Sequence, residues 1–228
     1  MKLFLTSALF CTFSIFPMAS HAYTETSFTY SGLYKSLKTS KESAFSQLSL
    51  QFLLLENKTR KLCPTDKVFI ADGEKKLEVL VNTDGALLLP LDKGLKKDHA
   101  AISFNTKNDE ACHLSMEISV ADFEFDNLSQ ENLLSWLDQF EALYTRLAGW
   151  PGRYFMPSVT GINLTLNGNN VSVQVIVNDN TLQKFTVDNL SLENKSLYLS
   201  RDAIEQLPAG SQLKIVGDLT KVLPRLEK

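Results

Sequence analysis

No apolar run in this sequence is long enough to cross a membrane as a helix. Such a helix needs about 20 apolar residues. The longest run, from Leu3 to Phe16, falls short of that length and lies at the start of the chain. We therefore expect no membrane insertion of the mature protein.

Basic residues form no stripe along the chain. The sequence has 23 Lys and Arg against 26 Asp and Glu, a formal net charge of -3, and neither sign clusters in the sequence. Nucleic acids and anionic membranes select a basic stripe on a protein. We therefore expect neither to be the main partner.

Catalytic, metal and nucleotide motifs are also missing. The chain contains no Gly-x-Ser-x-Gly and no His-Glu-x-x-His. Beyond the first 22 residues, its histidines are His99 and His113. We predict no catalytic residue, no metal site and no cofactor. A hydrolase stays open as an alternative, because a triad can be assembled from distant residues.

The first 22 residues have the pattern of a secretory leader. Lys2 precedes the apolar run, Pro17 follows it, and small residues stand at Ser20 and Ala22. This pattern predicts a signal peptide over residues 1–22 that is cleaved after Ala22. The short leader favours the periplasm of a bacterium.

Removing the leader, with Cys11 inside it, leaves one pair of cysteines, Cys63 and Cys112. In an oxidising compartment, a single pair predicts a disulfide. A metal pair lacks further Cys or His ligands at close spacing. A free nucleophile lacks an obvious base, because His113 adjoins Cys112 and adjacent side chains on a strand point to opposite faces.

The first part of the mature chain, residues 23–122, reads as β structure after one short helix. Apolar residues at helical spacing predict that helix over residues 29–39. Residues 46–56 read as a long strand. Short alternating runs follow, separated by Asp72-Gly73 and Asp84-Gly85, and Asp-Gly is a strong hairpin signal. We predict an antiparallel sheet or β-sandwich that carries the disulfide.

Residues 123–156 contain the longest predicted helix and a linker. Apolar residues recur at helical spacing from Leu133 to Leu147. Asn127 or Ser129 can cap its start, and Gly149, followed shortly by a proline, ends it. The apolar stripe is wide, so we expect the helix to be buried on more than one side.

Residues 157–228 return to β structure. A turn is predicted at Asn167-Gly168-Asn169, and the polar tail from Asp218 reads as a short helix or a docked arm. About 70 residues would be marginally stable alone, so this second, smaller antiparallel sheet should share a core with the long helix. The fold class predicted for the whole chain is α+β, mainly β.

Residues 86–104 and 196–216 share a loose pattern. Each has Leu-x-Leu on a strand, then an acidic residue, Asp92 or Asp202, that can cap a helical turn, then another strand. Apolar alternation and a helix cap are requirements of the fold and do not indicate a functional site. We interpret the pattern as a building block used twice.

The stretch "GWPGRYFMP" is the candidate partner-binding site. Trp150, Arg153, Tyr154 and Phe155 stand in a loop bounded by glycine and proline. Aromatic residues and arginine in a loop are typical of binding hot spots. The favoured interpretation is nevertheless a structural anchor that packs the end of the long helix inside the protein, because large apolar residues mostly lie inside.

Several stretches carry a resemblance to a known family: "FTYSGLYKSL", "LLLPLD", the two cysteines, the long helix and "FMPSVTGINLTL". With these features the chain resembles an uncharacterised domain-of-unknown-function family of exported proteins from Gram-negative bacteria. The resemblance implies export and this architecture, and it implies no catalytic residue.

Three functions fit these observations, and each predicts a different structure. A non-enzymatic periplasmic accessory protein that binds an envelope protein, which we expect first, predicts exposed Tyr154 and Phe155 or an open sheet edge. A carrier of a small apolar ligand predicts an apolar pocket lined by Trp136 or Tyr144. A hydrolase predicts a histidine within hydrogen-bond reach of a Ser, Cys or Asp in a cleft.

Overall fold

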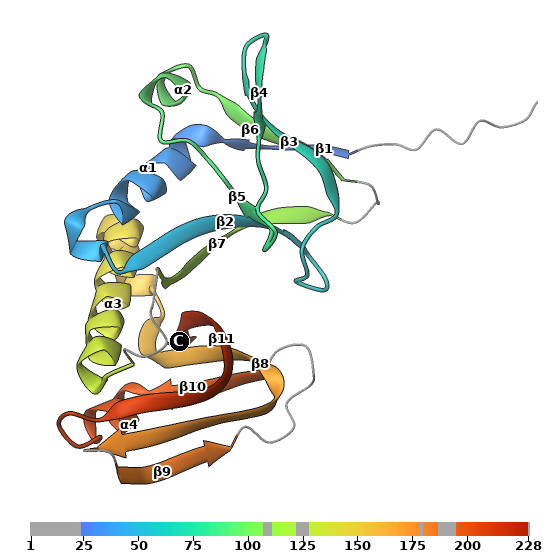
Figure 1. The fold of residues 1–228 in the computed structure, drawn as a ribbon. Helices are drawn as coiled ribbons and strands as arrows, with labels where there is room; N and C mark the ends of the chain where they lie inside the picture. Colours follow the sequence, from blue (N-terminus) through green and yellow to red (C-terminus); the bar gives the residue numbers. More distant parts are fainter. Residues whose placement is uncertain (1–23, 107–110, 122–127, 178–179, 187–194, 228) are drawn as a thin grey trace, which may run out of the picture.

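The structure, a computed structural model, describes residues 24–106, 111–121, 128–177, 180–186 and 195–227 (Figure 1). The predicted signal peptide lies outside these residues. The fold is α+β and mainly antiparallel β, as the sequence predicts. Three sheets and one long helix make up its frame.

Residues 24–106 and 111–121 form two small antiparallel sheets. The first has the strand order β1-β6-β3-β4 and the second the order β5-β2-β7. The strands are β1 (Thr24–Thr29), β2 (Leu48–Glu56), β3 (Thr65–Asp72), β4 (Lys75–Val79), β5 (Ala86–Leu87), β6 (Ala101–Thr106) and β7 (Cys112–Val120). The helices are α1 (Tyr30–Ser40), η1 (Ser43–Phe45) and α2 (Lys93–Lys97). We call this part the N-terminal region.

Local sequence explains the turns and strands of this region. Asp72 pairs with Lys75 across the β3–β4 hairpin, and Gly73 adopts the left-handed conformation that favours glycine, with φ 57°. On β2 the alternating residues Leu48, Leu50 and Phe52 are buried. The predicted hairpin, the helix near residues 29–39 and the strand near residues 46–56 are therefore confirmed.

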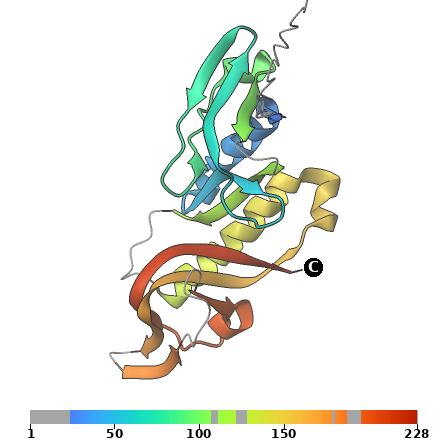
Figure 2. The same ribbon diagram turned by 90° about the vertical axis from the view of Figure 1, so that its right-hand side faces the viewer.

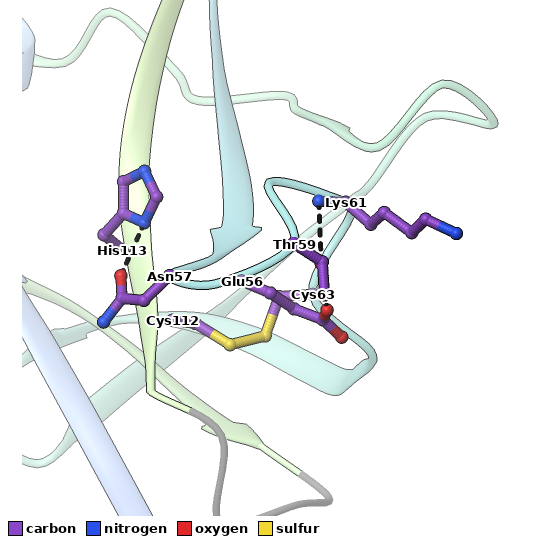
Figure 3. Close-up of a disulfide and its surroundings, with 7 residues drawn as sticks. All are labelled: Glu56, Asn57, Thr59, Lys61, Cys63, Cys112 and His113. Atoms are coloured by element: carbon purple, nitrogen blue, oxygen red, sulfur yellow. Dashed lines mark hydrogen bonds between the residues drawn. A yellow bond between two sulfur atoms is a disulfide. The ribbon is translucent and has the colours of Figure 1, made fainter.

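The predicted disulfide joins Cys63 to Cys112 (Figure 3). Their Cα atoms are 6.2 Å apart, and both side chains are buried. The bond ties the loop after β2 to the first residue of β7. β2 and β7 also pair along their whole length, from Leu48 opposite Val120 to Glu56 opposite Cys112. The disulfide therefore closes one end of a sheet that hydrogen bonds already hold.

Residues 158–177, 180–186 and 195–227 form the C-terminal sheet, in which β10 and β11 flank β8 and β9 also pairs with β8. Figure 2 shows β11, in red, alongside β8, in orange. Its elements are β8 (Ser158–Val177), β9 (Asn180–Thr186), β10 (Lys195–Ser200), α4 (Arg201–Glu205) and β11 (Gln212–Glu227). β8 is 20 residues long and β11 is 16. β11 pairs with β8 from Gln212 to Glu227, with bulges on the way.

One prediction for this region is wrong. No turn forms at Asn167-Gly168-Asn169, because β8 runs through these residues and pairs with β11 on both sides of them. The register only shifts there, between Val216 and Asp218 of β11, so a bulge takes the place of a reversal. Of the two alternatives for the tail from Asp218, a helix is excluded, because β11 continues to Glu227 and lies along β8.

The long helix α3 (Gln130–Gly152) lies beside both regions, with its first turns next to α4 and its last turns next to α1 (Figure 1). Ser129 caps it by accepting a hydrogen bond from the Asn132 amide at 3.2 Å, as predicted. Its buried residues are all apolar: Leu133, Trp136, Leu137, Phe140 and Leu143. They belong to one continuous core with buried residues of all three sheets.

Polar contacts fix α3 to each region from a different face. On one face, Ser135 donates to the Gln47 side chain at 3.1 Å, and Gln139 also bonds that side chain. On the other, the Gln130 amide group donates to the backbone oxygens of Ile204 and Leu207 at 2.9 and 2.8 Å. Residues 135 and 139 are one helical turn apart, which places them on the same face.

None of the helices in the described residues has the length and apolar character needed to span a membrane.

Candidate interaction surface

The chain turns sharply where α3 ends. Gly149 has φ 64°, a left-handed conformation that favours glycine. Trp150 is extended, with φ -97° and ψ 127°, which is the conformation that a following proline imposes on the residue before it. A short helical turn at Pro151 and Gly152 leads into the 3-10 helix η3 (Arg153–Phe155).

This turn places three aromatic side chains in solvent. Trp150 is 75% exposed, Tyr154 66% and Phe155 83%. Large aromatic side chains are normally mostly buried, and a cluster of exposed ones marks an interaction site on many proteins. We call Trp150, Arg153, Tyr154 and Phe155 the aromatic turn.

Arg153 holds one ring of the aromatic turn in place. Its Nη2 donates to the Tyr154 hydroxyl at 2.9 Å. Its guanidinium carbon also lies 4.9 Å from the centre of the Tyr154 ring, within the range of a cation–π interaction. The pair therefore offers a flat, ordered surface that loses little side-chain freedom when a partner binds.

A hollow of about 570 Å³ adjoins the aromatic turn. Ala142, Thr145 and Gly149 line it from successive turns of α3, and Trp150 and Arg153 line its end. Asp138, Glu141 and Arg146 complete the lining. Its volume lies in the range of sites that take one small molecule or one anchoring side chain, about 300–1,000 Å³.

Ion pairs fix the charged walls of this hollow. Arg201 of α4 bonds Asp138 at 2.9 Å and Glu141 at 3.3 Å. Arg146 lies 3.7 Å from Glu42. The lining of the hollow therefore carries both acidic and basic side chains, and these side chains are already paired. Such a lining suits a ligand with an apolar group flanked by polar groups better than it suits a free ion.

The favoured sequence interpretation of this stretch, a buried anchor, is wrong for Trp150, Tyr154 and Phe155. A buried anchor would require the chain after α3 to fold back into the core. Gly149 and the extended Trp150 instead direct the next residues outward, while Leu133, Phe140 and other residues of α3 fill the core. Asp138, Glu141 and Arg146 were not predicted as part of this surface. Asp138 and Glu141 are three residues apart, which places them on one face of α3, and this spacing was the available signal.

Within the described residues, neither His99 nor His113 is paired with a nucleophile. His113 Nδ1 lies 2.7 Å from the Asn57 side-chain oxygen (Figure 3). Its Nε2 lies 2.8 Å from Arg60 Nη1. Because a guanidinium can only donate, Nε2 accepts and Nδ1 donates, so both ring nitrogens are occupied. His99 is an exposed residue at a turn with φ 54°.

Two tyrosines outside the aromatic turn have shifted pKa values. Burial, with a smaller contribution from Glu117, raises the pKa of Tyr144 to about 12. Burial also raises the pKa of Tyr30. Both phenols therefore stay neutral at physiological pH, which suits hydrogen bonding and packing and offers no base.

The expectation that neither charge sign clusters needs correction at one place. The fold brings five lysines from two separate segments together around Tyr34: Lys35, Lys38, Lys93, Lys96 and Lys97. The sequence separates the two groups by more than 50 residues, so counting charges along the chain did not show them together.

These features define an α+β, mainly β protein with a disulfide in its N-terminal region and an exposed aromatic surface at the end of its long helix. A family model described as "Protein of unknown function (DUF2987)" matches residues 22–166, and the chain belongs to this family. The match spans the N-terminal region, α3, the aromatic turn and the first half of β8. No curated protein and no solved structure matches the chain.

Proposed function

We propose that this chain is a periplasmic accessory protein that binds another protein of the cell envelope through the aromatic turn, and that it catalyses no reaction. The observation that carries this proposal is the exposure of Trp150, Tyr154 and Phe155 on one short turn. Trp, Tyr and Arg are the residue types that dominate binding energy at protein interfaces.

The hollow beside the turn supports a protein as the partner. A partner can insert one apolar side chain against Ala142 and Trp150 while its polar neighbours meet the paired charges around Asp138 and Arg146. This arrangement, an anchored apolar group inside a polar rim, is the usual anatomy of a protein interface.

The alternative of an apolar-ligand carrier has less support. It requires a pocket lined by Trp136 or Tyr144, but Trp136 is only 4% exposed and belongs to the core. The hollow beside the aromatic turn is lined by other residues. A hydrolase has less support still, because the ring nitrogens of His113 are engaged by Asn57 and Arg60.

Export to the periplasm is part of the proposal. The leader pattern of residues 1–22 and the Cys63–Cys112 disulfide support it, because structural disulfides persist in oxidising compartments. Cell fractionation followed by mass spectrometry of the intact protein tests it. We expect a periplasmic species that begins at Tyr23 and contains the disulfide. A cytoplasmic species that retains residues 1–22 would contradict it.

Site-specific photo-crosslinking in intact cells tests the binding role. A photoreactive residue replaces Phe155, and a matched control places it at Leu80, an apolar residue that is 68% exposed in the N-terminal region. We expect one envelope protein to be captured from position 155 and not from position 80.

A second substitution makes the result specific. Trp150→Ala should abolish capture from position 155, because it removes the largest ring of the surface, while the fold should persist because Trp150 is exposed. Leu80→Ala should leave capture unchanged. Crosslinks only within the chain, or the same proteins captured from both positions, would refute the proposed surface.

A further inference from the structure

A second hollow, of about 370 Å³, lies between α1 and α2, far along the chain from the aromatic turn. Every charged side chain that lines it is a lysine. The lining consists of Tyr34, Lys35, Lys38, Lys93, Lys96 and Lys97. We call it the lysine hollow.

Helical spacing directs these lysines to one place. Lys35 and Lys38 are three residues apart on α1, and Lys93, Lys96 and Lys97 are three and four residues apart on α2. Residues at these spacings share a helix face, and α1 and α2 pack against each other (Figure 1). The two lysine-bearing faces therefore open into the same hollow.

The wall that carries α2 is fixed by the start of α1. Tyr30 is fully buried; its hydroxyl donates to the Pro90 carbonyl and accepts from the Asp92 amide, the latter at 3.0 Å. Its own amide donates to the Ala100 carbonyl at 2.9 Å. The chain is thus held on both sides of α2. Asp92 caps the helix by accepting from the Gly94 amide at 2.6 Å.

No ion pair within the described part of the chain neutralises the lysines of the lysine hollow. Among the residues that the structure describes, no carboxylate forms an ion pair with any of the five lysines. Lys96 instead lies with its Nζ 5.3 Å from the centre of the Tyr34 ring. The chain as a whole is acidic, with a net charge of -3. A protein surface that serves only solubility carries charges of both signs. In the lysine hollow, by contrast, charges of one sign lie close together and repel each other until an anion binds.

We propose that the lysine hollow binds a small anion that carries two or more phosphate groups. Each phosphate monoester carries a charge of about -1.5 to -2, so one phosphate cannot balance five ammonium groups, and two or three are needed to approach their charge. Lysine binds phosphate as a point charge without the fixed geometry of arginine. The volume suits one small molecule or one lipid headgroup, not a nucleic acid duplex. This site is independent of the proposed partner surface.

Titration of the mature, disulfide-bonded protein with pyrophosphate tests the proposal. We expect saturable binding at low ionic strength, detected by calorimetry, that weakens steadily as salt is added. Lys35→Gln combined with Lys96→Gln, one change on each wall, should weaken binding by about tenfold or more, because each charge-assisted hydrogen bond contributes strongly. Lys61→Gln combined with Lys214→Gln is the control. It removes the same charge from exposed positions elsewhere and should change affinity by less than about twofold.

Vesicles distinguish the source of the phosphate. Vesicles of phosphatidylcholine that contain phosphatidic acid offer phosphomonoester headgroups on a surface, and vesicles of phosphatidylcholine alone are the blank. Tighter binding to the phosphatidic acid vesicles than to pyrophosphate, lost in the Lys35/Lys96 variant, identifies a lipid headgroup site. Binding to pyrophosphate alone identifies a soluble ligand.

Three outcomes would overturn the proposal. The first is no binding of wild-type protein to pyrophosphate or to the vesicles. The second is equal weakening in the control variant, which would mean that only the overall charge matters. The third is binding to a DNA oligonucleotide without binding to either phosphate probe. Circular dichroism checks that the surface variants remain folded.

Discussion

The N-terminal region and the C-terminal sheet stabilise antiparallel strands in different ways. In the N-terminal region, seven short strands form two sheets, and the Cys63–Cys112 disulfide closes one end of the second. In the C-terminal sheet, the 20-residue β8 pairs with the 16-residue β11 along almost its whole length. Short strands gain from a covalent tie, whereas long strands supply many continuous hydrogen bonds and cross-strand contacts.

The two regions share the long helix α3 and one core. α3 contributes buried residues to one continuous core and contacts each region through its own polar face, with Gln139 toward the N-terminal region and Gln130 toward α4. A small sheet buries too little apolar area to be stable alone. We therefore expect the helix to make the two regions unfold as one cooperative unit, and the following substitutions test this expectation.

Phe140→Ala should have the largest effect and should act on both regions. Phe140 is completely buried in the shared core, and such a truncation costs about 3–5 kcal/mol in the free energy of unfolding. Hydrogen exchange should show β2 and β8 losing protection together. Loss confined to one region would show that the two regions unfold independently.

Replacing both cysteines, Cys63→Ala with Cys112→Ala, should lower the free energy of unfolding by about 3–4 kcal/mol in the chain-entropy model. The loop that the bond closes has a sequence separation of 49. In one cooperative unit, global unfolding should become more frequent in both regions, and additional local opening should occur at the ends of β2 and β7. Hydrogen exchange with and without the substitutions measures both effects, and unchanged exchange in β8 and β11 would argue against cooperative unfolding.

Gly161→Ala is the corresponding test for the C-terminal sheet. A Cβ at position 161 would meet the Leu199 carbonyl oxygen and the Ser200 Cα at less than 3 Å, because β10 passes close to β8 there. The cost should be about 1–3 kcal/mol, measured by urea denaturation. Gly32→Ala on α1, where nothing lies within 4 Å, is the control and should stabilise the protein slightly.

Lys221→Met should weaken the direct link between the regions. Lys221 of β11 forms an ion pair with Glu117 of β7 at 2.6 Å, while Glu117 also accepts from Gln51 at 2.7 Å. We expect a loss of about 0.5–1 kcal/mol that shrinks as salt is added. An equal loss at low and high salt would mean that packing of the lysine chain, and not its charge, is what matters.

Phe155→Ala should leave stability almost unchanged, within about 0.5 kcal/mol, because the side chain is 83% exposed. It should nevertheless reduce capture of the partner by a photoreactive residue placed at Tyr154. Thermal unfolding and crosslinking of the same variant provide both readouts. A marked loss of stability would show that Phe155 packs against the protein in solution.

Much of the local structure could be predicted because its causes lie within a few residues. The α3 cap at Ser129 and its end at Gly149 are examples, as is the Asp72-Gly73 hairpin. Sequence-based prediction was less accurate where pairing with a distant strand determines the backbone conformation. Asn167-Gly168-Asn169 is compatible with a turn, but pairing with β11 keeps it extended. Likewise, Asp202 was expected to cap the second building block, and the structure uses Ser200, whose hydroxyl accepts from the Ala203 amide at 3.1 Å.

The candidate sites depended even more on tertiary structure. The residues of the aromatic turn were recognised by type, but their exposure follows from which side chains of α3 fill the core first. The lysine hollow could not be recognised along the chain, because α1 and α2 are brought together by Tyr30 and its contacts with Pro90 and Asp92.

The sequence by itself determined the fold class, the cysteine pair and the positions of most helices and turns, because side-chain periodicity, capping and backbone preferences act locally. Only the tertiary structure decided that β8 is continuous, that the aromatic turn faces solvent and that five lysines share one hollow. These features depend on contacts between residues far apart in the chain, whose free energies no short stretch of sequence contains.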